Sequence, residues 1–536
     1  SDAPERFFYL SSAHRELGST YPSEGRMSTA DLDRFASAVA GGDRRLMLQT
    51  NVFGTNSPNT PARNPPGRTP SAAYAGDWAA WVGARGIPAD FEIGNEPEHF
   101  VKADGAFSPW FWLGDYIEAF RDQAREIRLR HSSGDLRVFG PATNIGASSG
   151  RANVLATNHL DTRAPKRSDG LPLGFRDGAF GDGSGDDFGW RVLDFWLRRT
   201  ASAPASERPD GISIHYYPGT RASAANGERA DDGGDGFSWR TQRSAAQAFV
   251  YHFERVSELS EHWYGRRLPV VVSEWHSGLV ATNEHRQSQS GSLGAALQQL
   301  DTVATFAQVG VESHAFYSVH EVGPRKPFWW RTDADDSYGM LTGLLDQHQT
   351  ATSVSARAPN TPTPTYFTMA MWGKLMGDHV LARPTRLGSF EEQEVSTYAT
   401  VDDEGDVQVL IINKTSAAAP VRIDFLDSHE KKYSEAKATW ISPGAPANDQ
   451  NILQTRGWMM NGRLQLLSNL SLPEPVRFPG DVDGYWFFHE VPAYTAIVFE
   501  FAPEPRGTLQ VDDCQVLGQC EEECGDVEGP CIGPGA

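Results

Sequence analysis

The chain has 536 residues, and its 69 acidic against 48 basic side chains give a formal net charge of −21. This length predicts two to four domains, at about 100–200 residues per domain. The excess of acid argues against nucleic acid and anionic membrane surfaces as partners, because their phosphates would be repelled. No apolar run is long enough to predict a transmembrane helix. Residue 1 is not Met and no signal peptide is visible, so we expect a mature or trimmed product.

Short β-rich apolar runs alternate with helical patterns from residue 7 to about residue 320. Strands repeatedly followed by helices indicate βα units and a parallel sheet. We therefore predict a (β/α)8 barrel over residues 1–376. Seven strands are recognisable, and if the run at 90–95 is the fourth, the first is missing. The predicted strands are 7–10, 46–52, 90–95, 137–141, 212–217, 270–275 and 315–320. The predicted helices are 28–40, 71–85, 112–130, 190–199, 244–264 and 292–309.

The pattern changes after about residue 376, where alternating and β-branched segments follow one another with turn residues between them. No long helical pattern interrupts them, which favours an antiparallel β-sandwich over residues 377–503. The predicted strands are 395–401, 407–412, 421–425, 436–442, 463–467 and 495–501. The chain thus reads as an α/β barrel followed by a smaller all-β domain.

The last segment, residues 504–536, is an acidic tail that holds all four cysteines: Cys514, Cys520, Cys524 and Cys531. Their close spacing without a histidine favours a small disulfide knot whose pairing stays open, and a four-cysteine zinc site is the minor alternative. Disulfides predict an oxidising, secreted or periplasmic location. The tail could link the chain to a further domain or partner.

Two apolar runs each deliver a glutamate to a strand end. Phe91-Glu-Ile-Gly-Asn-Glu-Pro97 places Glu96 after one strand, and Val270-Val-Val-Ser-Glu-Trp275 places Glu274 at the end of another. Consecutive valines indicate a strand that is buried on both faces. A carboxylate there is costly unless it is paired or functional. A solvated or salt-bridged glutamate would explain either one alone, but the pair favours a catalytic site.

These two motifs resemble the retaining glycoside hydrolases of clan A. The chain looks most similar to the heparanase and β-glucuronidase group, and the xylosidase/iduronidase and agarase/porphyranase groups are nearly as similar. The resemblance implies a (β/α)8 fold with Glu96 as acid/base at the end of strand four. It implies Glu274 as nucleophile at the end of strand seven. In that clan the Asn before the acid/base holds the sugar 2-hydroxyl, and Asn95 matches this position.

Further residues are candidates for substrate binding. His215 and Tyr217 share one strand face by the two-residue period. They resemble the clan's sixth strand, where the tyrosine hydrogen-bonds the nucleophile. Sugars stack on aromatic faces, and Trp275 and Trp329 follow predicted strand ends, although tryptophans are often merely packed in a core. His276 follows Glu274 by two residues and could reach the site. Arg325 could bind an acidic sugar carrying uronate or sulfate.

The sequence therefore predicts a secreted retaining β-glycoside hydrolase that acts on a β-linked, possibly acidic, polysaccharide or oligosaccharide. The alternatives are a non-catalytic carbohydrate-binding protein and an extracellular matrix or structural protein built on the same barrel. No metalloprotease, P-loop or dinucleotide motif is present, so neither a cofactor nor a catalytic metal is expected.

Overall fold

The computed structural model describes most of the predicted barrel strands and helices and most of the C-terminal domain. The described segments are 45–50, 52, 72–97, 113–131, 136–145, 188–217, 245–276, 292–316, 362–381, 394–425, 433–448, 458–464, 471–484 and 486–503, with the isolated residues 8–9, 26–27, 37, 239, 243 and 452. Among these residues, no helix has the length and apolar character needed to cross a bilayer.

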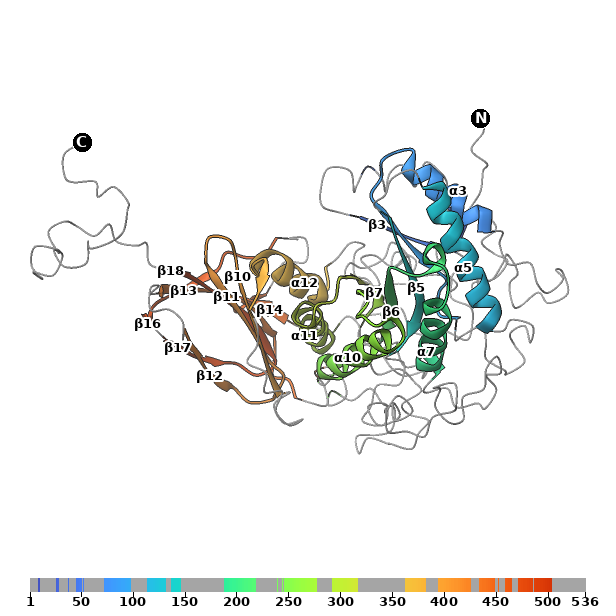
Figure 1. The fold of residues 1–536 in the computed structure, drawn as a ribbon. Coiled ribbons are helices and arrows are strands. Elements are labelled where there is room, and N and C mark those ends of the chain that lie inside the picture. The colour runs from blue at the N-terminus through green and yellow to red at the C-terminus, as the bar shows by residue number, and fades with distance from the viewer. Residues whose placement is uncertain are drawn as a thin grey trace, which may run out of the picture.

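Six parallel strands form the first sheet, and each pairs with the next one in chain order. They are β3 (Leu46–Thr50), β4 (Ala89–Ile93), β5 (Leu136–Asn144), β6 (Gly211–Tyr216), β7 (Val270–Trp275) and β8 (Ser313–Phe316). The connecting helices are α3 (Ala72–Gly83), α5 (Leu113–Arg130), α7 (Phe188–Ala201), α10 (Ala245–Tyr264) and α11 (Leu293–Val309). Figure 1 shows these helices along the outer side of the sheet. The predicted succession of βα units is therefore confirmed over six strands.

One predicted barrel strand, 7–10, was wrong. Within it, β1 (Phe8–Tyr9) pairs antiparallel with β2 (Arg26–Met27) and not with β3. β1 and β2 form a two-stranded sheet of their own, separate from the six-stranded one. In the described part of the chain, β3 is the first strand of that sheet.

An ion-pair network at the start of the strands shows that the sheet is curved. Asp90 of β4 binds Arg45, which precedes β3, and Arg137 of β5, both at 2.7 Å. Arg137 also binds Glu312, which precedes β8. Because β5 and β8 stand three places apart in the sheet order, one side chain can join them only if the sheet curls, as it does in a barrel.

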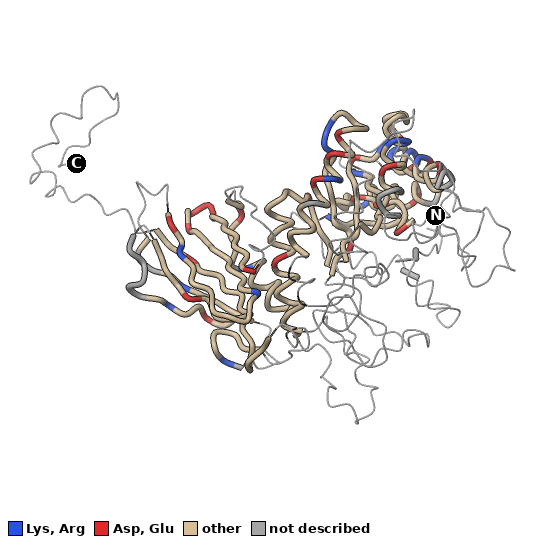
Figure 2. Tube along the Cα trace, turned by 90° about the horizontal axis from the view of Figure 1, so that it is seen from below, with Lys and Arg blue, Asp and Glu red and all other residues tan. Residues whose placement is uncertain are grey.

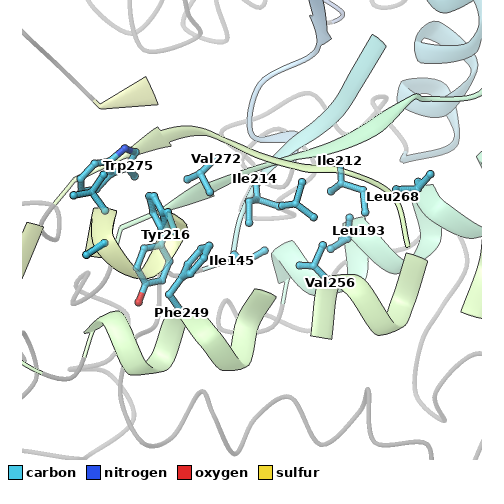
Figure 3. Close-up of a cluster of buried hydrophobic side chains, with 14 of the residues drawn as sticks. Ile145, Leu193, Ile212, Ile214, Tyr216, Phe249, Val256, Leu268, Val272 and Trp275 are labelled. Carbon is cyan, nitrogen blue, oxygen red and sulfur yellow. The ribbon is translucent and has the colours of Figure 1, made fainter. Parts of the chain in front are cut away.

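The outward side chains of the sheet pack against the helices. Figure 3 shows Ile214 and Tyr216 of β6 and Trp275 of β7 among Phe249 of α10 and neighbouring apolar side chains, all of them buried. Alternation along a strand sends the residues between them to the opposite, inner face. His215 lies between Ile214 and Tyr216, so its polar side chain is on the inner face of β6, near the C-terminal end of the strand.

The C-terminal domain is antiparallel throughout its described strands. It follows α12 (Pro364–Leu375), its strands pair into one ten-stranded sheet, and its buried aromatic side chains include Phe487, Phe499 and Phe501. The predicted sandwich of two packed sheets stays a prediction. The strands are β9 (His379–Val380), β10 (Val395–Val401), β11 (Val407–Asn413), β12 (Ala419–Asp424), β13 (Tyr433–Pro443), β14 (Trp458–Met460), β15 (Arg463–Leu464), β16 (Val476–Gly484), β17 (Trp486–Val491) and β18 (Thr495–Pro503).

A buried polar joint connects the two domains. Lys414, directly after β11, binds Asp301 of α11 at 2.7 Å, and both side chains are 2% exposed. The Lys414 amine also donates to Ser396 Oγ and the Arg243 carbonyl, and Tyr398 donates to the second Asp301 oxygen. Apolar residues of α11, α12 and β11 belong to one continuous core around this joint. The C-terminal domain is thus packed directly onto the barrel helices.

Surface charges on the barrel side pair with one another. Figure 2 shows basic and acidic positions lying close together at the barrel end of the molecule. Arg121 and Arg125 of α5 bind Glu207 of the short helix η4 (Ala205–Glu207). Burial opposes ionisation of Glu207, but the two guanidinium groups outweigh it and hold the pKa of this carboxyl below its usual value. These pairs attach η4 to α5.

Candidate active site

The turn after β4 directs Glu96 to the inner end of the sheet. Gly94 adopts φ 94° and Glu96 φ 42°, backbone conformations that a non-glycine residue rarely adopts. A Cβ on Gly94 would lie 2.8 Å from the Tyr116 ring, so glycine is required there for space as well as for its backbone. The Glu96 amide donates to the Ala142 carbonyl of β5 at 2.9 Å. Such left-handed residues concentrate at functional sites.

A register shift between β6 and β7 brings Glu274 beside His215. The pairing Ile214↔Val272 is followed by His215↔Glu274, so Ser273 is an extra residue on β7. An irregularity of this kind re-aims the side chain that follows it. Glu274 and His215 consequently become direct neighbours at the ends of the two strands.

Two glutamates and a histidine converge at this edge. His215 Nδ1 lies 3.0 Å from Glu96 Oε1 and 3.6 Å from Glu274 Oε2. The Tyr217 hydroxyl donates to Glu274 Oε2 at 2.8 Å. One oxygen of each glutamate and one histidine nitrogen all lie within 4.8 Å of one another. The side chains of Glu96 and Glu274 stay about one-fifth exposed, at 19% and 21%, so a ligand can reach both.

The charges of this cluster perturb its proton equilibria. Burial lowers the pKa of His215, but the negative charges of Glu274, Glu96 and Glu92 outweigh burial and raise it to about 10. Burial raises the pKa of Glu274, and the nearby glutamates add to this, while His215 and the Tyr217 hydrogen bond oppose it. At neutral pH the histidine is therefore held as a cation. Two carboxylates and a histidine are also metal-ligand types, and a metal ion bound there would displace the proton of His215.

A second polar layer lies next to this cluster. The Gln49 amide nitrogen donates to Glu92 Oε2 at 2.8 Å and to Asn95 Oδ1 at 2.9 Å. Glu92 and Asn95 are both buried. Glu92 shares the inner face of β4, two positions from Gly94 and four from Glu96. Its negative charge contributes to raising the pKa of both His215 and Glu274.

Sequence reasoning missed Gln49 and Glu92. The alternation of β4 was a usable signal for Glu92, because Phe91 and Ile93 are the apolar, helix-facing residues of that strand. Gln49 stands in an apolar run with no motif around it, and only the pairing of β3 with β4 places it opposite Glu92.

The structure brings together most of the predicted site residues that it describes. His215 and Tyr217 contact Glu96 and Glu274, and Asn95 lies in the adjacent polar layer through its hydrogen bond with Gln49. The catalytic and sugar-binding roles predicted for these residues stay predictions. Trp329 and Arg325 lie outside the described residues, so their predicted roles stay predictions.

The prediction for Trp275 needs correction. β7 runs through residue 275, so alternation turns Trp275 away from Glu274 and into the core against Phe306 of α11 and Phe316 of β8. It is completely buried and has no exposed face on which a sugar could stack.

His276 is also buried, with a ring nitrogen 3.3 Å from the Gln299 amide of α11 and its ring near Phe316. In this structure its described neighbours come from α11 and β8, and the predicted sugar contact is replaced by packing.

Comparison with solved structures finds glycoside hydrolases of the same fold. Cel44A, a family 44 endoglucanase from Clostridium thermocellum, is 12% identical with a TM-score of 0.53, over 93% of this chain and 91% of that one. A monomeric β-xylosidase from Caulobacter crescentus CB15 is 15% identical with a TM-score of 0.52, over 90% and 86%. CelM2, a bifunctional glucanase-xylanase from a metagenome library, is 13% identical with the same score and coverage.

These likenesses show the fold, which the chain shares with the three glycoside hydrolases along nearly its whole length. They do not single out the heparanase and β-glucuronidase group that the sequence resembled most. No protein-family model matches the sequence, and neither does any curated protein.

Proposed function

We propose that this chain is a retaining β-glycoside hydrolase in which Glu274 is the nucleophile and Glu96 the acid/base. The observation that carries the proposal is the approach of the two carboxyl groups, with one oxygen of each within 4.8 Å of the other. Retaining enzymes hold the two groups about 5–5.5 Å apart, whereas inverting enzymes leave about 6.5–9.5 Å for a water. The short separation supports double displacement.

In the first step the Glu274 carboxylate attacks the anomeric carbon while the bond to the leaving oxygen breaks. Glu96 gives its proton to that oxygen, and a glycosyl ester on Glu274 results. In the second step Glu96 takes a proton from water, which attacks the same carbon and releases Glu274. The sugar leaves with its original anomeric configuration.

The surrounding groups prepare Glu274 for this role. A buried carboxyl resists ionisation, and the hydrogen bond from Tyr217 and the positive charge of His215 counteract that resistance. Because His215 contacts both glutamates, the pair titrates as one coupled unit. Ester formation removes the charge of Glu274, which leaves His215 beside Glu96 when that group must act as a base.

The substrate that we propose is a β-linked oligosaccharide or polysaccharide. The endoglucanase, the glucanase-xylanase and the β-xylosidase named above support this class by their own activities. A uronate- or sulfate-bearing glycan and a secreted location are further parts of the proposal. A non-catalytic carbohydrate-binding barrel is less well supported, because a binding protein needs neither the close carboxyl pair nor its hydrogen-bonded tyrosine.

The test is hydrolysis of a panel of aryl β-glycosides and β-glycans by the wild type, Glu274→Gln and Glu96→Gln. Loss of the nucleophile should lower kcat/KM by at least about 10⁴-fold. Loss of the acid should lower it by about 10²–10⁴-fold on substrates with poor leaving groups. The loss should be much smaller on aryl glycosides whose leaving group needs no proton.

A matched control is Glu500→Gln in β18, which neutralises another half-buried carboxyl whose pKa burial raises. Glu500 lies in the C-terminal domain, and its variant should keep wild-type activity. A wild type that hydrolyses nothing on the panel, or a Glu274→Gln variant as active as wild type, would refute the proposed function.

A further inference from the structure

The polar layer next to the catalytic pair forms a hydrogen-bonded chain with a fixed direction. It runs from Glu92 on β4 to Gln49 on β3 and back to Asn95 in the turn after β4. Both bonds use the same atom, the Gln49 amide nitrogen. That nitrogen carries two hydrogens, and each is directed to one of the two oxygens.

The Glu92 carboxylate fixes the orientation of the Gln49 and Asn95 amide groups. An ionised carboxylate can only accept hydrogen bonds, so Gln49 must present its NH2 group to Glu92. The remaining hydrogen of that NH2 group needs an acceptor, so Asn95 must present its carbonyl oxygen to Gln49. The Asn95 NH2 group is then directed away from Gln49.

We propose that Glu92, acting through Gln49, is a positioning residue that holds Asn95 with its NH2 group as the donor toward the substrate. The inference rests on the proposed glycosidase function and deepens it. A site that offers a fixed N–H donor at Asn95 selects sugars with an acceptor oxygen on the carbon next to the anomeric centre. Substrates without that oxygen gain nothing from the chain.

Burial makes the arrangement effective. Glu92 and Asn95 are 2% and 7% exposed, so water competes little for their hydrogen bonds. A site built to hydrogen-bond a substrate hydroxyl discriminates strongly against the analogue that lacks it. Rotation of the Asn95 amide would place a carbonyl oxygen where the donor is needed and would remove the discrimination.

The experiment compares kcat/KM of Gln49→Met and wild type on an aryl β-glycoside and on its 2-deoxy analogue. Methionine keeps the approximate volume of Gln49 but removes both hydrogen bonds. We expect a loss of about 10-fold on the 2-hydroxyl substrate, the effect of one hydrogen bond, and less than about 3-fold on the 2-deoxy substrate. A merely structural role would lower both rates equally.

Glu92→Gln provides a second variant that keeps the shape of the chain. Its amide can present either an oxygen or an NH2 group to Gln49, so the direction of the chain is no longer fixed. The same selective loss on the 2-hydroxyl substrate is expected.

Gln123→Met is the matched control. Gln123 on α5 is a buried glutamine that accepts a hydrogen bond from Thr50, the residue next to Gln49, at 2.7 Å. This variant should keep the wild-type ratio between the two substrates.

If both variants kept the wild-type ratio of kcat/KM between the 2-hydroxyl and the 2-deoxy substrate, this inference would be overturned. The proposed glycosidase function would still stand. A wild type inactive on both substrates would overturn the two proposals together.

Discussion

The molecule contains two buried charged clusters that are built in opposite ways. At the domain joint, one cation, Lys414, meets one carboxylate, Asp301, and Lys414 has three oxygen acceptors within 3.0 Å. At the strand ends, one histidine cation faces the negative charges of Glu92, Glu96 and Glu274. The joint is balanced in charge, and the strand-end cluster carries an excess of carboxylate.

The difference separates a structural cluster from a reactive one. In a balanced, fully hydrogen-bonded ion pair each buried charge is compensated by its partner, so removing one partner is costly for stability. A cluster with surplus carboxylates must share protons among its members. That sharing is what general acid–base chemistry requires.

Breaking the balanced cluster should have the larger effect on stability. Lys414→Met leaves Asp301 buried without its cation, which typically costs about 3–5 kcal/mol. The double variant Lys414→Met/Asp301→Leu removes both charges and should recover most of that loss. Chemical denaturation of the two variants and wild type measures the effect. A double variant no more stable than the single one would show that the cluster is more than a charge pair.

Breaking the unbalanced cluster should change how stability depends on pH. The pKa of His215 is raised in the folded state to about 10, from an ordinary value near 6.5. Its stabilising contribution is therefore complete below about pH 6.5 and is lost as the pH rises through 10. The loss cannot exceed about 1.4 kcal/mol per pH unit for one proton. His215→Gln should remove this contribution from the slope of unfolding free energy between pH 7 and pH 10.

His252→Gln is the control for that measurement. Burial lowers the pKa of His252 in α10 to about 4, so this histidine is neutral throughout the alkaline range. The stability that it contributes is present above about pH 6.5 and is lost as the pH falls through 4. The His252→Gln variant should show the same change of unfolding free energy between pH 7 and pH 10 as the wild type. If the unfolding free energy of His215→Gln depended on pH between 7 and 10 as that of the wild type does, the charged state assigned to His215 would be contradicted.

The sequence predicted the parts of the fold and site that local patterns encode. Alternating apolar runs located all six parallel strands to within a few residues, and the two carboxylates followed because each ends an apolar run. The register shift at Ser273 carries no sequence signal, yet it aligns His215 with Glu274. Motif reasoning grouped these residues correctly because strand ends of a parallel sheet meet at one edge.

Residues that act through partners on other elements escaped prediction. The role of Gln49 depends on its hydrogen bond to Glu92, and that of Lys414 on its ion pair with Asp301. Each contact joins residues that are far apart in the sequence, so no local pattern indicates it. Trp275 was misassigned because the strand continues through it, so that it faces the helices. In the C-terminal domain, β9, β14, β16 and β17 were missed. β9 and β14 are only two and three residues long, and Pro and Gly interrupt the alternation of β16.

The assignment of Glu274 as nucleophile has one direct test. Incubation with a 2-deoxy-2-fluoro β-glycoside that carries a good leaving group should trap the glycosyl ester. The fluorine destabilises the oxocarbenium-like transition states of both steps, and the good leaving group accelerates only the formation of the ester. Intact-mass and peptide mass spectrometry should then find one sugar per chain, attached to Glu274, and none on Glu274→Gln. A sugar attached to Glu96, or an active enzyme that yields the inverted anomer with no adduct, would contradict the account.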